Sequence, residues 1–109
     1  KFHGWGTGTT AEAVGDTGLV TEFTTEYVTN STRVTGTQLE GSSANVYKSV
    51  ATFAPDSGTT LAVTEHGIFL AATGATTLMD RTVSAAVSLV VANADTLQTT
   101  YEYTATAGA

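Results

Sequence analysis

Residues 97–106 read LQTTYEYTAT, and less polar side chains alternate there with polar ones at every step. Side chains of a β-strand point alternately to opposite faces, so this pattern predicts a strand with one buried and one exposed face. The expected inner set is Leu97, Thr99, Tyr101, Tyr103 and Ala105. Threonine favours the same fold class along the whole chain, because 24 of the 109 residues are threonine and a β-branched side chain suits a strand better than a helix.

A second alternating stretch, residues 81–91, lies directly upstream. Its predicted inner face holds Val83, Ala85, Val87, Leu89 and Val91. The Asn93-Ala94-Asp95 segment that follows has the composition of a tight turn. We therefore expect residues 81–91 and 96–106 to be adjacent strands of one sheet, joined as an antiparallel hairpin.

Turn-forming residues divide the rest of the chain into short strands, expected at 33–40, 46–53, 60–71 and 77–80. Residues 55–58 and 72–75 predict turns, and Gly67 marks a bulge or a close backbone approach. Residues 6–18 predict a long loop over a sandwich edge, and 18–28 fit either a strand or a short helical turn. Turns about every eight to twelve residues are typical of a sandwich or barrel. The chain is expected to be all-β, a single antiparallel β-sandwich or jelly-roll-like domain spanning 1–109.

Composition excludes several classes of function. The formal net charge is −6, which lacks the basic footprint that nucleic-acid binding needs. The sequence contains no cysteine, so disulfides and thiolate metal sites are excluded, and no apolar run is long enough to predict a membrane span. Large apolar residues are few and charged residues make up only 13%, so we expect burial against other subunits as a homo-oligomer or in a lattice.

The most unusual stretch is His3-Gly4-Trp5-Gly6-Thr7-Gly8, which superficially resembles a phosphate-binding loop. It lacks the Lys-Ser/Thr pair and the following helix that such a loop requires. We instead expect the glycines to let backbone pass close to Trp5, whose ring would anchor one end of a thin core.

Glu65-His66 and Asp80-Arg81 are the other polar pairs that suggest chemistry. A metal or acid–base site could use His66 with His3, but the ligand spacing of a zinc site is missing, and a structural histidine at a strand end is favoured. A Ser-His-Asp triad from His66 and Asp80 would lack the usual nucleophile elbow. Arg81 is expected to form an intramolecular ion pair, with contact to a neighbouring subunit as the alternative. We expect no catalytic residue, no metal and no cofactor. The Asn30-Ser31-Thr32 segment fits a glycosylation acceptor or, more simply, an Asx-turn.

Three segments together resemble a family of small structural proteins encoded by tailed bacteriophages. They read HGWGTGTTAE at 3–12, TEHGIF at 64–69 and TLMDRTV at 77–83. In that family a Thr-Glu-x-Gly-hydrophobic-Phe segment precedes a Leu-hydrophobic-x-Arg-x-Val strand and a terminal Thr-rich strand. Ser84 departs from the pattern, which has an aromatic residue after the Arg-Thr-Val run. The resemblance implies a non-enzymatic virion component with a β-sandwich or jelly-roll fold.

Within a virion, an acidic β-domain fits the outer surface of the capsid. The expected function is that of a decoration, or cement, protein whose partners are the major capsid protein and copies of itself, without nucleic acid or membrane. The alternatives are a tail or fibre module, and a carbohydrate-binding domain in which Trp5 or Tyr101 and Tyr103 stack on sugar rings. The structural or interface candidates are Trp5, His66, Phe69, Arg81, Tyr101 and Tyr103.

Overall fold

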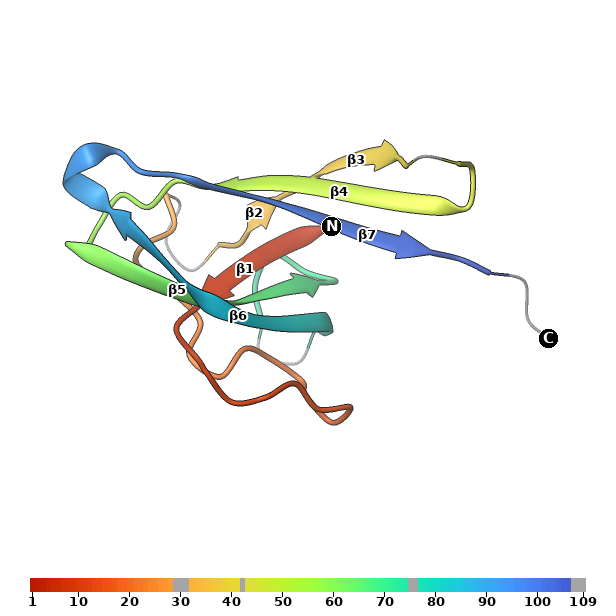
Figure 1. Cartoon of the computed structure of the whole chain (residues 1–109), viewed down its shortest axis with the longest axis horizontal. Helices are drawn as coiled ribbons and strands as arrows, with labels where there is room; N and C mark the ends of the chain where they lie inside the picture. The colour runs from red at the N-terminus through yellow and green to blue at the C-terminus, as the bar shows by residue number, and fades with distance from the viewer. Residues whose placement is uncertain (29–31, 42, 75–76, 107–109) are drawn as a thin grey trace.

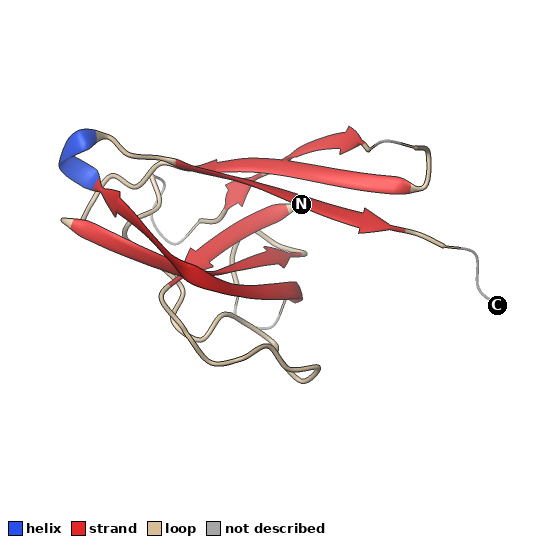
Figure 2. Cartoon of the chain, in the orientation of Figure 1, coloured by secondary structure: helices blue, strands red, loops and turns tan. Residues whose placement is uncertain are grey.

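The computed structural model describes residues 1–28, 32–41, 43–74 and 77–106. Its strands form two antiparallel sheets that face each other (Figures 1 and 2). One sheet has four strands in the order β2-β1-β5-β6, and the other has three in the order β3-β4-β7. The predicted all-β antiparallel sandwich is therefore confirmed.

The strands are β1 (Phe2–Gly6), β2 (Val34–Thr35), β3 (Thr37–Glu40), β4 (Val46–Phe53), β5 (Thr60–Phe69), β6 (Leu78–Val90) and β7 (Leu97–Thr104). The bounds of β4 are those expected from the sequence. In β7, Leu97, Thr99 and Tyr101 are half-buried and the residues between them are exposed, as the alternation predicted, but Tyr103 and Ala105 of the predicted inner set are exposed. In the described part of the chain, no helix is long and apolar enough to cross a membrane.

The predicted hairpin between residues 81–91 and 96–106 is wrong. β6 pairs with β5 and β7 pairs with β4, so the two strands belong to different sheets. The connection contains a turn of 3-10 helix, η1 (Val91–Asn93), followed by Ala94 in the left-handed conformation with φ 56°. This longer connection crosses from one sheet to the other, where a two-residue turn would have folded the chain back within its own sheet.

The expected strand at 33–40 is also divided between the sheets. β2 pairs with β1, β3 pairs with β4, and Gly36 lies between them. A Cβ atom at Gly36 would collide with Ser49 Oγ and His3 Nε2, so the chain can change sheets here only because residue 36 has no side chain. The Gly36 N–H donates to the carbonyl of Lys1 at 2.7 Å.

β5 carries two irregularities, between Val63 and Glu65 and between Ile68 and Phe69. Neither is centred on Gly67, which pairs regularly with Gly4 and with the backbone of β6. Side chains crowd Gly67 instead, since an added Cβ would lie 2.9 Å from atoms of three neighbours. Close approach is thus the correct alternative for this glycine. The turn at 55–58 is present, with Gly58 at φ 95°.

The first third of the chain differs most from expectation. Residues 2–6, expected only to pass close to a core, form β1 at the interior of the four-stranded sheet. Residues 18–28, all of them described, form no strand or helix and contribute one isolated bridge, Gly6 to Glu22. The predicted turns at 30–32 and 72–75 extend into residues 30, 31 and 75, which lie outside the described ranges.

The core lies between the sheets near Trp5, whose ring stacks on Phe53 with centroids 5.1 Å apart and an angle of 11° between their planes. The buried cluster consists of Trp5, Phe23, Tyr27, Ala51, Phe53, Leu61, Val63 and Leu89. Beyond this core the three-stranded sheet continues past the end of the four-stranded one (Figure 1). We call this projecting part, residues 39–41, 43–48 and 102–106, the arm. It lengthens the molecule to 49 Å against 28 and 25 Å in the other directions.

Candidate functional site

β1 and β5 bring two histidines together inside the sandwich. Trp5 pairs with His66 across the two strands, and His3 is on the same face of β1 as Trp5. His3 Nδ1 lies 2.9 Å from His66 Nε2, and His3 Nε2 lies 2.8 Å from Ser49 Oγ on the opposite sheet. The three side chains therefore form a hydrogen-bonded chain that joins the sheets beside Trp5.

Burial keeps both imidazoles uncharged. Desolvation, with a smaller contribution from the N-terminal ammonium group, lowers the pKa of His3 to about 4. Desolvation and the neighbouring His3 lower the pKa of His66 to about 3. At neutral pH the N–H of one ring can donate a hydrogen bond to the unprotonated nitrogen of the other, and the Ser49 hydroxyl completes the network.

This network does not form an accessible nucleophile. Ser49 and His3 are both 0% exposed, so a substrate cannot reach the serine hydroxyl. The Ser-His-Asp combination considered from the sequence is not assembled either, because the Asp80 carboxylate binds the Arg81 N–H and the Tyr101 hydroxyl. In the described ranges, no group of three or more His, Cys, Asp or Glu side chains is placed to hold a metal ion.

Glu65 is the centre of a second polar cluster on the other face of the four-stranded sheet. Its carboxylate accepts hydrogen bonds from the backbone N–H groups of Gly8, Val20 and Thr21 at 2.8 to 3.0 Å. It also accepts one from Arg81 Nε at 3.0 Å. Burial alone would raise the pKa of Glu65, but the backbone donors and the guanidinium outweigh it and hold the pKa below its ordinary value.

Arg81 forms the intramolecular ion pair expected from the sequence, with partners that the sequence did not indicate. Besides Glu65, it binds Asp16 Oδ2 through Nη1 at 3.1 Å and donates to the carbonyl of Thr10 through Nη2 at 2.7 Å. The adjacent Asp80 is not its ion-pair partner. We call the described residues between β1 and β2, 7–28 and 32–33, loop 7–33, and Arg81 fixes two points of it to the sheet.

A third cluster, around Arg33, was not foreseen. Its guanidinium forms a two-point contact with Glu22, at 2.8 and 2.9 Å, and donates to the carbonyls of Ala71 and Gly74. It also lies 3.5 Å from the centre of the Phe69 ring, which is fully buried. The sequence gives no periodic signal for this cluster, because its members come from the segment before β2, the end of β5 and the connection after β5.

A cleft of about 420 Å³ opens between the sheets along β6 and β7. Trp5 and His66 lie at its inner side, and Trp5 Nε1 donates to Thr99 Oγ1 at 3.0 Å. The Tyr101 hydroxyl donates to Asp80 Oδ2 at 3.1 Å and so links β7 to β6. Burial, and next the hydrogen bond to Asp80, raise the pKa of Tyr101 to about 12.

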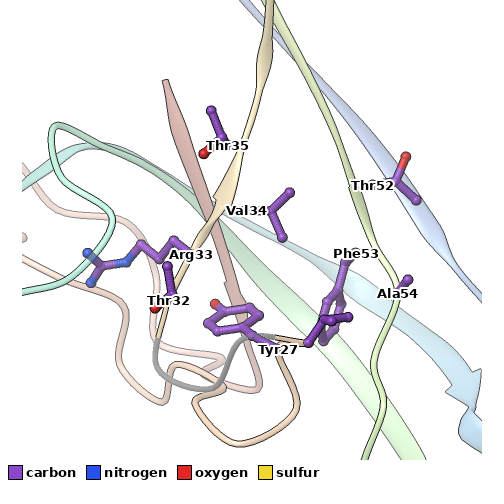
Figure 3. Close-up of a pocket in the computed structure, with 9 residues that line it drawn as sticks. Tyr27, Thr32, Arg33, Val34, Thr35, Thr52, Phe53 and Ala54 are labelled. Atoms are coloured by element: carbon purple, nitrogen blue, oxygen red, sulfur yellow. The ribbon is translucent and has the colours of Figure 1, made fainter.

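A second hollow, of about 390 Å³, lies at the opposite edge beside β2 and β4 (Figure 3). Tyr27, Val34 and Phe53 give it an apolar lining, and Figure 3 shows the guanidinium of Arg33 pointing away from Thr52 and Phe53. With its charged group turned aside, this hollow offers a ligand mainly apolar contact.

Exposed aromatic surface lies instead on the arm. Tyr47 and Tyr103 are cross-strand partners and are 37% and 55% exposed. Trp5 is 0% exposed, so the idea that it stacks on sugar rings is wrong, although Tyr103 remains accessible. The six candidate residues therefore separate into an interior set of Trp5, His66, Phe69 and Arg81 and a peripheral set of Tyr101 and Tyr103.

The interior polar clusters hold the sheets and the long loop together, and the arm carries the accessible aromatic surface. No protein-family model, no curated protein and no solved structure matches this chain.

Proposed function

We propose that this chain is a non-enzymatic structural protein of a tailed-bacteriophage virion, a decoration protein that binds the outer capsid surface and stabilises contacts between capsomers. The observation that carries the proposal is the contrast between interior and surface. The buried ionisable groups bind other parts of the same fold, whereas an exposed tyrosine pair lies on a projecting arm. Exposed aromatic residues on a protruding element are typical of protein–protein contacts.

The three segments that resemble phage structural proteins meet in one place, which supports the proposal. They contain most of β1, the C-terminal part of β5 and the beginning of β6, three strands that are neighbours in the four-stranded sheet. Glu12 reaches β6, where its carboxylate accepts a hydrogen bond from the Val83 N–H at 2.7 Å. The shared residues therefore describe one packed unit, and the net charge of −6 is suited to the outside of a shell better than to contact with packaged DNA.

Binding to empty capsid shells tests the proposal. The protein should sediment with shells, and Tyr103→Ser should weaken binding about 30-fold, equivalent to about 2 kcal/mol, if Tyr103 is an interface anchor. Val14→Ser is a matched control, because Val14 is fully exposed on loop 7–33 and lies outside the arm. Absence of shell binding, or equal binding by both variants, would reject the proposal.

The tyrosine pair also favours a second candidate, binding of carbohydrate by Tyr47 and Tyr103, since aromatic rings stack on sugar faces. A glycan array distinguishes this function, because a decoration protein is expected to bind shells and no glycan. Antibody labelling of intact particles would separate a capsid location from a tail or fibre location.

A further inference from the structure

β7 lies at the edge of the three-stranded sheet and pairs with β4 alone among the described strands. It is eight residues long and contains a single charged residue, Glu102, and no proline. Long uncharged edges of this kind add further strands readily, which is why proteins usually protect them. β7 is therefore an edge on which a strand of another molecule can pair.

The other long edge, β6, is protected by carboxylates. The N–H of Arg81 donates to Asp80, that of Val83 to Glu12, and that of Val90 to Asp95. Each of these bonds occupies a backbone donor with a negatively charged side chain. No such bond is made to a backbone N–H between Leu97 and Thr104, all of which are described.

The register shows which backbone groups of β7 face outward. The Ala105 N–H donates to the carbonyl of Asn45, next to the pair formed by Val46 and Thr104. Residues of an antiparallel ladder alternate between those that bond to the partner strand and those that do not. The outward groups are consequently those of Gln98, Thr100, Glu102 and Thr104.

We propose that β7 pairs with β7 of a second copy of this chain, antiparallel and centred on Tyr101, to form a continuous six-stranded sheet. In this register Tyr101 faces its own copy, and Thr100 faces the Glu102 of the second copy. A register centred on Glu102 would oppose two carboxylates. Within each copy, Lys48 lies directly across from Glu102 on β4, so the edge carries no unbalanced charge into the interface.

The shape of the molecule suits this arrangement. β7 begins over the core and ends in the arm (Figure 1). Antiparallel pairing places the arm of each copy beside the core end of the other, and both four-stranded sheets then lie on the same side of the shared sheet. The inference rests on the proposed structural function in that it names one partner, and the two are tested separately.

A pair of cysteine variants tests the register, because the natural chain has no cysteine. Facing residues of a non-hydrogen-bonded pair have Cα atoms about 4.5 Å apart, within the range for a disulfide. Tyr101→Cys should oxidise to a covalent dimer at least tenfold faster than Tyr103→Cys, which faces Thr99 of the second copy. Equal rates, or no covalent dimer from Tyr101→Cys, would overturn the proposal.

Sedimentation tests the edge itself. At tens of micromolar the natural chain should be a dimer, Thr100→Pro should be a monomer with an unchanged circular dichroism spectrum, and Thr100→Val should remain a dimer. Thr100→Pro removes an outward N–H and no bond to β4. A monomeric natural chain, or a dimeric Thr100→Pro, would contradict the pairing. If Thr100→Pro does not fold, the cysteine variants decide whether β7 pairs with β7. A covalent Tyr101→Cys dimer that fails to bind shells would reject the decoration function and leave the pairing intact.

Discussion

His3 and His66 are held neutral by burial, and this makes stability depend on pH. Their pKa values in the fold are about 4 and about 3, whereas an unfolded histidine titrates near 6.5. The unfolded chain therefore takes up protons first as the pH falls below 6.5, and stability is lost down to the folded pKa values. Between pH 7.5 and 5 we expect the free energy of unfolding to fall by about 2 kcal/mol for each histidine that stays neutral.

Urea unfolding as a function of pH measures this loss. The range above pH 5 avoids most carboxylate titration, so Glu65 contributes little there. His66→Gln is the control, because its amide can still bond to His3 but does not titrate, and it should show about half the loss of the natural chain. A natural chain whose stability is constant from pH 7.5 to 5 would contradict the neutral pair.

Trp5 contributes to stability through its ring and through one hydrogen bond. Trp5→Ala removes the stack on Phe53 and leaves a cavity, so we expect a cost of about 3 to 5 kcal/mol. Trp5→Phe keeps a ring but loses the bond from Nε1 to Thr99, and its cost should be smaller. Chemical denaturation of both variants at pH 7.5 is the measurement. If Trp5→Ala unfolded within 1 kcal/mol of the natural chain, on the order of a surface change, the core assignment would be wrong.

Glu65 on β5 attaches loop 7–33 to the four-stranded sheet through hydrogen bonds to the loop backbone. Glu65→Gln removes the fully buried one of the two carboxylates that pair with Arg81, and we expect it to destabilise the fold by about 3 to 5 kcal/mol. Asp16→Asn is the matched control, because the Asp16 side chain is 26% exposed against 0% for Glu65, and its effect should be about 1 kcal/mol or less. Urea unfolding gives the energies, and limited proteolysis shows whether the loop opens first. Equal effects of the two variants would mean that burial does not distinguish the two carboxylates.

The strands that the sequence predicts are those with clear alternation or with turn residues at their ends. Alternation predicts β7 and the following turn residues predict β4, and in both strands one face packs toward the core while the other meets solvent. β1 was missed since glycine weakens the strand signal. Gly4 and Gly6 are on the face of β1 that points away from His3 and Trp5. On that face Glu22 and the backbone of Thr21 leave no room for a Cβ atom.

Local sequence could not predict which strands share a sheet. Asn93-Ala94-Asp95 gave a correct turn but an incorrect hairpin, because turn composition does not specify whether the chain stays in its sheet. Prediction of the histidine site from local sequence was limited in the same way. His3 and His66 are 63 positions apart, and only the pairing of β1 with β5 shows that they touch.

The whole molecule has its ordered interior at one end and the arm at the other. Part of loop 7–33 lies against one face of the four-stranded sheet, where the Arg81–Glu65 pair helps to hold it, and the three-stranded sheet lies against the other face (Figure 1). Only the core half of the three-stranded sheet has a second sheet beneath it. The arm is therefore the part of the domain whose order depends least on the core, and it is the part that the proposed pairing of β7 would stabilise most.

This difference predicts a gradient of hydrogen exchange. In monomeric Thr100→Pro, amides of β5 should exchange slowest, because β5 is paired on both sides and most of its residues are buried. Amides of β3 and of Val46–Lys48 should exchange through local opening, at a free energy well below that of global unfolding. Mass spectrometry of exchange at neutral pH resolves the two regions.

In the natural chain the even-numbered amides of β7 should become protected as the protein concentration rises, since they are the groups that bond across the edge. Arm amides as slow as those of β5 in the monomer would show that both sheets unfold as one unit and that the arm needs no partner to be ordered.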